Sequence, residues 1–410
     1  MSPWPGEREE KALANKITAL LFLVLLTGFL GGCWNRKEIT EIAIVLGTGV
    51  DWTADGRIRL TVQIARPTAF VGGSEAGAGG REAPASWVVS AEGKTIEEAE
   101  RYLAMKAPRD LYWGHSVILV FGEEMAKKGT DIARNFFQRD RQPRETMWMM
   151  VAKGEAKDFL ETYSALAKTS AQAAGFLTRM KTCYAVQLRE YAEMLASKGV
   201  QPVVTAVEVK EAGVTPGLGQ ETKSPAYKQV ELDGVGVFKD DKLIGWLDAY
   251  ETRGLLWLKG EVMKGVVTVP SPGERDKQVS IVIRRGKTQV VPVYDGEHLR
   301  FDVKVKVEGD MVEQQSRENL AKPEKIRALE NEVAADIKRR AAIVLEKAQW
   351  EYGADIFGFG DAFHRKYKKK WRELKDRWDE EFARAEVDIA VEAHIREIGL
   401  QTRRAGTPEK

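Results

Sequence analysis

Cys33 is the residue whose type and position most clearly predict a chemical reaction. It directly follows Leu30, Gly31 and Gly32. Leu30 is the last residue of the apolar run ITALLFLVLLTGFL, which covers residues 17–30. A cysteine thiol is the one side chain that can take up diacylglycerol, and small residues before it admit an extended chain to a peptidase. The run is too short to span a bilayer comfortably as a helix. We therefore interpret it as the core of a signal peptide.

Residues 30–33 resemble the lipobox that the lipoprotein signal peptidase cuts. We expect residues 1–32 to be a lipoprotein signal peptide and Cys33 to carry covalent diacylglycerol, with no other cofactor. An uncleaved helical anchor and an ordinary secretory signal are the alternatives, and both keep the protein outside the cytoplasm. The region before the apolar run departs from the usual pattern, because its positive and negative charges balance where signal peptides carry a positive excess.

Motifs that would bind a nucleotide fail a test of spacing. Two Gly-Lys-Thr triplets, at residues 93–95 and 286–288, lack the first glycine of a phosphate loop, because Val88 and Ile281 stand at that position. The four histidines are scattered and show no spacing typical of metal ligands. We expect no catalytic, cofactor-binding or metal-binding residues, and we interpret His115 as a structural histidine.

The charge balance argues against a nucleic-acid partner. The chain has 63 Lys and Arg against 61 Asp and Glu, whereas proteins that bind polyanions usually carry a concentrated basic excess. Eight basic residues do gather over residues 365–377. We interpret them as the solvated face of a helix around Trp371 and Trp378, with contact to lipid headgroups as the alternative. After lipidation Cys183 is the only thiol left, so no internal disulfide can form, and we interpret it as a small buried side chain.

The first half of the chain alternates strand-like and helix-like segments. Residues 42–50 and 58–64 predict a hairpin, and Thr95 with Glu98 predicts the capping box of a helix. Residues 156–195 are mostly helical in pattern, with a break expected near Gly175. These elements predict a mixed α+β domain over residues 33–200.

The second half predicts another α+β domain, over residues 229–402, after a linker region at 201–228 and before a tail at 403–410. Its pattern gives short strands, a turn at Asp240, Asp241 and Lys242, and a long helix that opens at Pro323. A second helix carries Trp371 and Trp378 on one face, and a strand ends the domain. We therefore expect a multi-domain α+β protein with mixed sheets packed with helices, whose C-terminal module has two long helices against a sheet.

Four ordered blocks resemble the Ger(x)C family, the C subunit (lipoprotein) of bacterial spore germinant receptors. They are residues 33–39 with 42–51, residues 111–126 with Arg139, Asp140 and Arg144, residues 236–247 with Glu251, Thr252 and Gly254, and residues 352–360 with Trp371, Trp378 and Phe382. Asn35 stands where the family usually has aspartate. The block residues that we take as candidate interaction or motif residues are Trp34, His115, Asp240, Asp241, Lys242, Gly245, Trp246, Glu251, Asp355, Phe357, Gly358, Phe359, Gly360, Trp371 and Trp378.

The resemblance implies a lipid-anchored, non-enzymatic subunit on the extracytoplasmic face of the spore inner membrane. Its implied partners are the A and B membrane subunits of the receptor and, through the anchor, membrane lipid, and the implied process is nutrient-triggered germination. The family has no established catalytic residues to carry over. A lipid-anchored solute-binding protein that captures the germinant directly is the alternative, although its two lobes would usually show similar element orders. An extracytoplasmic enzyme is a third hypothesis. The sequence shows no nucleophile, metal-ligand or acid–base set of residues that would support it.

Overall fold

The computed structural model describes residues 13–22, 38–67, 85–162, 164, 166–180, 183–211, 228–262 and 264–399. Cys33 and Trp34 lie outside these described residues. The chain divides into two compact units, residues 1–42 and 43–410. In the first unit, residues 13–22 are helical and Ile39–Glu41 form a 3-10 turn. Among the described residues, no helix is long and apolar enough to cross a bilayer.

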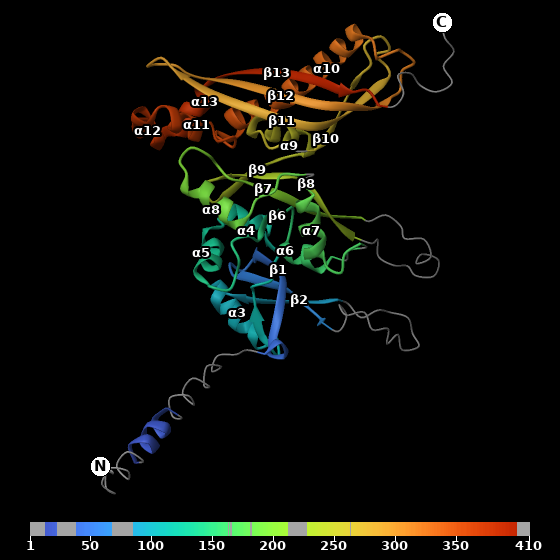
Figure 1. Ribbon diagram of the computed structural model, residues 1–410. Coiled ribbons are helices and arrows are strands. Elements are labelled where there is room, and N and C mark those ends of the chain that lie inside the picture. The colour runs from blue at the N-terminus through green and yellow to red at the C-terminus, as the bar shows by residue number, and fades with distance from the viewer. Residues whose placement is uncertain are drawn as a thin grey trace, which may run out of the picture. The chain divides into compact units, whose positions relative to one another are not determined.

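A mixed nine-stranded sheet dominates the first half of the larger unit (Figure 1). Its strand order is β3-β2-β1-β5-β6-β7-β8-β9, and β4 pairs beside β1. The central strands β1, β5, β6 and β7 are parallel, and the outer pairs on both sides are antiparallel. The strands are β1 (Ile42–Trp52), β2 (Ile58–Ala65), β3 (Ser86–Gly93), β4 (Asp110–Tyr112), β5 (Ile118–Phe121), β6 (Trp148–Ala152), β7 (Val203–Glu211), β8 (Lys228–Lys239) and β9 (Lys242–Leu247).

Helices cover both faces of this sheet, because the buried residues of its central strands alternate between two apolar clusters. In β5, Leu119 and Phe121 join the larger cluster, and Ile118 and Val120 join the smaller one. On the larger-cluster face lie α3 (Ile96–Ala104), α4 (Glu123–Lys128), α5 (Asp131–Arg139) and α8 (Leu188–Ala196). On the other face lie α6 (Ala156–Glu161) and α7 (Ser170–Arg179).

One sequence expectation for this half is confirmed, one is confirmed in part and one is wrong. The β1–β2 hairpin forms, and Thr95 caps α3 as expected by accepting a hydrogen bond from the Glu98 N–H at 3.1 Å. The other half of the expected capping box is absent, because the Glu98 carboxylate accepts the Lys94 N–H instead of the Thr95 N–H. The expected helix break near Gly175 does not occur, because α7 runs through it. Glycine is needed there for close packing, since an added Cβ would lie 2.6 Å from Val117.

The sheet does not end at the linker region expected over residues 201–228. β7 lies inside that region, and β8 and β9 extend the same sheet beyond it. The proline- and glycine-rich segment at 212–227 is outside the described residues, and it connects two antiparallel neighbours of one sheet. A composition rich in turn-forming residues is typical of any long connection. The composition of this segment therefore does not distinguish a connection between two strands of one sheet from a boundary between domains.

The second half contains a four-stranded sheet in the order β10-β11-β12-β13. Its strands are β10 (Gly265–Pro270), β11 (Gln278–Tyr294), β12 (Leu299–Gln314) and β13 (Glu386–Glu397). Along β12, Phe301, Val303 and Val305 are buried, whereas Lys304 and Lys306 face away and reach Glu392 of β13. One face of this sheet therefore packs on the core and the other is charged.

Helices pack against the apolar face of this sheet, which confirms the expected α+β architecture (Figure 1). They are α9 (Ala249–Lys259), α10 (Pro323–Glu346), α11 (Phe359–Lys366), α12 (Lys368–Leu374) and α13 (Trp378–Arg384). Only α10 is long, and it continues into a π-helix at Lys347–Tyr352. The expected second long helix is three short ones. The backbone leaves helical geometry at Tyr367, whose hydroxyl accepts a hydrogen bond from the Tyr294 N–H, and a 3-10 turn at Lys375–Arg377 separates α12 from α13.

One apolar cluster runs through both halves. It contains residues of the first sheet such as Val45 and Phe121, residues of α9 such as Trp257, and residues of the second sheet such as Phe301. Apolar burial is the main favourable contribution to folding. The two sheets therefore share their principal source of stability.

Candidate functional site

The turn between β8 and β9 holds three of the candidate residues. Lys239 pairs with Lys242, so Asp240 and Asp241 form a two-residue turn, as the sequence predicts. Asp240 has a φ of 53°, a left-handed conformation that aspartate tolerates better than most residues. The carboxylate of Asp241 accepts a hydrogen bond from the Asp131 N–H at 3.1 Å. The turn is thereby fastened to the first residue of α5, and Lys242 is exposed.

Trp246 is joined to the end of α10 through its backbone carbonyl. That oxygen accepts hydrogen bonds from the Tyr352 hydroxyl at 2.9 Å and from the Lys347 ammonium at 3.1 Å. Gly245 permits this approach, because an added Cβ would lie 2.4 Å from the Tyr352 ring. The indole of Trp246 faces the Lys153 ammonium, 5.7 Å from its ring centroid.

Glu251 connects the start of α9 to the same lysine. Its carboxylate accepts a hydrogen bond from the Asp248 N–H at 2.9 Å and completes a capping box. It also pairs with the Lys347 ammonium at 3.0 Å. This contact, with those of Gly245 and Trp246, joins residues 245–251 to Lys347 and Tyr352. Together with residues 355–360, which pack on residues 199–201, these residues form what we call the inter-sheet interface.

Asp355 is fully buried at the other end of this interface. Its carboxylate accepts five N–H groups, four from the backbone of Phe357, Gly358, Phe359 and Gly360 at 2.7–3.2 Å and one from the Trp378 indole at 3.0 Å. Burial raises the pKa of Asp355 to about 6, although these hydrogen bonds oppose the rise. Asp355 shapes the turn that follows it.

Two glycines of that turn answer specific steric needs. Gly358 has a φ of 83°, in the left-handed region. Gly360 lies against Gly199, and a Cβ added to Gly360 would be 2.5 Å from the Gly199 Cα. The turn therefore fits directly on the chain that leads into β7.

The aromatic candidates form a packed cluster beside Asp355. Phe359 stacks on Phe301 with centroids 4.8 Å apart, and Trp371 meets Trp378 edge to face at 5.2 Å. Phe357 is buried next to Phe359. The basic residues of 365–377 are mostly exposed around this cluster, which fits both a solvated helix face and contact with lipid headgroups.

Other residues singled out from the sequence lie apart from the interface. His115 is exposed, and its ring centroid is 5.8 Å from that of Tyr112. Cys183 is half-buried rather than buried, and burial raises the pKa of its thiol to about 11, so the thiol is neutral at ordinary pH. Cys33 and Trp34 are outside the described residues.

The inter-sheet interface has the character of a structural joint. The polar groups described above form hydrogen bonds and ion pairs with one another. The buried carboxylate of Asp355 faces N–H donors rather than a nucleophile or a base. Within the described residues no three His, Cys, Asp or Glu side chains are grouped so that they could hold a metal ion. Sequence reasoning missed Lys347 and Gly199, whose only local signals are a lysine at the end of a helical pattern and a glycine after one.

Two family models together match most of the chain. The model described as "Spore germination protein N-terminal domain" matches residues 35–209, and the model described as "Spore germination B3/ GerAC like, C-terminal" matches residues 233–399. Of the inter-sheet interface, residues 245–251 and 347–360 fall within the second match, and Gly199 falls within the first.

Curated relatives match over nearly their full length. Spore germination protein KC of Bacillus subtilis (strain 168) is 28% identical over 95% of this chain and 97% of its own. Spore germination protein B3 of the same organism is 26% identical over 94% and 98%. Spore germination protein GerQC of Bacillus cereus is 20% identical over 93% and 98%.

A solved structure shares the fold. The crystal structure of the GerBC protein superposes with a TM-score of 0.52, covering 85% of this chain and 96% of that one at 22% identity. The α+β architecture described above is therefore one that a solved protein adopts.

Proposed function

This chain belongs to the Ger(x)C family of spore germination proteins, and on that premise we propose that it is a lipid-anchored, non-enzymatic subunit of a spore germinant receptor. In this proposal it acts with the A and B membrane subunits in nutrient-triggered germination. It stands on the extracytoplasmic face of the spore inner membrane, held by diacylglycerol on Cys33.

The main support for the proposal is that residues in the blocks resembling the family make contacts that hold the fold together. Trp246, Glu251 and Asp355 belong to the blocks that resemble the family, and each is engaged in holding one part of the fold to another. Residues whose task is to fix a shape suit a protein that acts by association. An enzyme would be expected to place some such residues around a reacting atom.

The anchor is supported by the sequence of residues 30–33. Each buried methylene of an acyl chain contributes about 0.8 kcal/mol, so two chains are enough for stable membrane retention. An anchored domain also meets its membrane partners at a high effective concentration, which permits assembly through modest contacts.

Co-purification tests the proposal. A tagged copy of the chain, produced in sporulating cells of the source bacterium, is extracted from spore membranes with mild detergent, and the captured proteins are quantified by mass spectrometry. We expect a multi-pass A-type protein and a permease-like B-type protein at near-stoichiometric amounts. A tagged, unrelated lipoprotein from the same membrane is the control. Equal recovery of both partners with that control, or recovery of neither, would contradict the proposal.

A further inference from the structure

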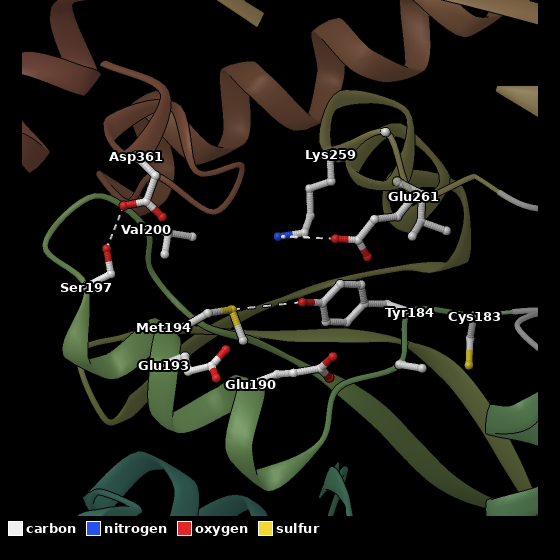
Figure 2. A pocket seen from close by; sticks show the side chains of 13 residues that line it. Cys183, Tyr184, Glu190, Glu193, Met194, Ser197, Val200, Lys259, Glu261 and Asp361 are labelled. Carbon is white, nitrogen blue, oxygen red and sulfur yellow. Dashed lines mark hydrogen bonds and ion pairs between the residues drawn. The ribbon is translucent and has the colours of Figure 1, made fainter. Parts of the chain in front are cut away.

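A cleft of about 610 Å³ opens next to the inter-sheet interface (Figure 2). It lies between α8 and residues 183–185 on one side, and the C-terminal end of α9 with Asp361 on the other. Its volume is within the range of about 300–1,000 Å³ that small-molecule sites usually have. None of the candidate residues drawn from the sequence lines it.

Lys259 points into this cleft from the end of α9 (Figure 2). Its side chain is only 10% exposed, and its nearest carboxylate oxygen, on Glu261, is 3.8 Å away. Within the described residues its ammonium group donates no hydrogen bond, and its other contact is the Tyr184 ring, whose centroid is 5.6 Å from Nζ. In the part of the chain that the structure describes, the Lys259 Nζ is not among the buried polar atoms that lack a partner, so water reaches it in the cleft, and its three N–H donors are open to a ligand. The site therefore favours a ligand that brings acceptor oxygens to Lys259.

Tyr184 offers a second underused donor beside the lysine. It is 4% exposed, and its hydroxyl donates to the Met194 thioether sulfur at 3.9 Å, which is a weak acceptor. Burial, together with the carboxylates of Glu261 and Glu190, raises the pKa of Tyr184 well above its ordinary value, so the hydroxyl keeps its proton. A ligand oxygen could replace the sulfur as its partner.

Carboxylates surround the rest of the cleft. Glu190 and Glu193 line it from α8, and Glu261 and Asp361 line it from the opposite side, with Lys259 as the basic residue among the lining side chains. Glu190 and Asp361 each accept a single hydrogen bond from the protein, whereas a carboxylate has room for about four. A ligand that is only anionic would be repelled by this lining, and one that is only cationic would leave the lysine donors without acceptors.

We propose that this cleft binds a small zwitterion, with its carboxylate held by Lys259 and Tyr184 and its ammonium group held by the carboxylates of Glu190 and Glu193. Met194, Val200 and Leu256 supply an apolar wall for an aliphatic side chain. The site is separate from the proposed function: receptor assembly could fail its own test with the cleft still binding ligand, and the reverse.

Calorimetric titration of the full chain, purified in detergent, tests the site with three matched probes. They are L-leucine, 4-methylpentanoate, which lacks the ammonium group, and 3-methylbutylamine, which lacks the carboxylate. We expect L-leucine to bind at least about tenfold more tightly than either analogue, since each analogue loses a charge-assisted hydrogen bond. Absence of L-leucine binding, or equal binding of the three probes, overturns the proposal.

Variants locate the binding. Lys259→Met should weaken L-leucine binding about tenfold or more, whereas Lys198→Met, at an exposed lysine outside the cleft, should leave it unchanged. The exposed pair Glu190→Gln and Glu193→Gln can fold even if Lys259→Met cannot, and it should narrow the preference for L-leucine over 4-methylpentanoate. Bound L-leucine should also slow alkylation of Cys183, which lines the cleft, by N-ethylmaleimide. An unchanged preference in the glutamine pair, or unaltered alkylation, contradicts the proposed site.

Discussion

The Trp378 indole donates a hydrogen bond to the buried carboxylate of Asp355 at 3.0 Å, across 23 residues of chain. This contact fastens α13 to the turn that Asp355 organises. The backbone carbonyl of Asp355 also accepts a hydrogen bond from the N–H of Gln201, which lies just before β7, at 2.6 Å. Asp355 thus connects three segments that are distant in sequence.

Replacing Asp355 should destabilise the protein strongly. Asp355→Asn puts an amide NH₂ group where an oxygen now accepts N–H donors, so at least one buried donor loses its partner. We expect the free energy of unfolding to fall by about 2–4 kcal/mol, measured by urea unfolding at pH 7. Asp361→Asn, at a half-buried carboxylate that accepts one hydroxyl, is the matched control and should cost under about 1 kcal/mol. Equal losses in the two variants would contradict this role of Asp355.

Gly245 and Tyr352 should show energetic coupling. Gly245→Ala places a Cβ 2.4 Å from the present position of the Tyr352 ring, so we expect a loss of about 1–3 kcal/mol in unfolding free energy. Adding Tyr352→Ala removes the obstruction, and the two losses should then sum to more than the double variant shows. Tyr102→Phe, at an exposed tyrosine, serves as a control for general effects of tyrosine replacement. Strict additivity in the double variant would refute the steric explanation.

Asp51 should make stability depend on pH. It is buried and accepts hydrogen bonds from Ala156 and Lys157 N–H groups at the start of α6, and burial raises its pKa to about 6 from 3.8. Because the folded-state pKa is the higher one, protonation favours the folded state. This contribution is fully present below about pH 4 and is lost as the pH rises through 6.

The comparison of wild type with Asp51→Asn isolates that contribution. Between pH 7 and pH 5 the wild type should gain about 1 kcal/mol of unfolding free energy relative to the variant, since one pKa unit corresponds to about 1.4 kcal/mol. Urea unfolding at the two pH values measures the difference. Parallel pH profiles would show that Asp51 does not titrate in this range.

Lipid attachment should depend on one cysteine only. Cys33→Ala removes the thiol that takes up diacylglycerol, so metabolic labelling with a radioactive fatty acid should disappear and the protein should leave the membrane fraction or be degraded. Cys183→Ala removes the other cysteine and should leave labelling intact. Membrane retention of the Cys33→Ala protein at wild-type level would mean that residues 17–30 remain as a helical anchor.

Local patterns were sufficient for much of the fold. Alternating residues predicted the β1–β2 hairpin and the last strand, and Pro323 marked the start of α10. These elements depend on periodicity and on capping, which a single sequence displays. The same holds for the turn at Asp240 and Asp241.

Long-range packing decided the rest. Strand β7 lies within the linker expected at 201–228, and the sequence pattern did not predict it. A strand that is buried on both faces does not alternate between apolar and polar residues. The helix expected around Trp371 is divided at Tyr367, which contacts Tyr294, 73 residues earlier in the chain. Lys259 and Tyr184 are likewise distant in sequence, so the cleft between them had no local signal.

The place of β8 and β9 in the first sheet has a consequence for how the protein is made. Strand β7 pairs with β8 on one side, and this partner ends at residue 239. Because the chain is synthesised from its amino terminus, the edge of β7 that pairs with β8 stays unpaired until β8 has been made. Open edges invite pairing with other chains. Biogenesis is therefore most vulnerable after β7 has been made and before β8 follows it, and a pause in synthesis at that stage would favour aggregation.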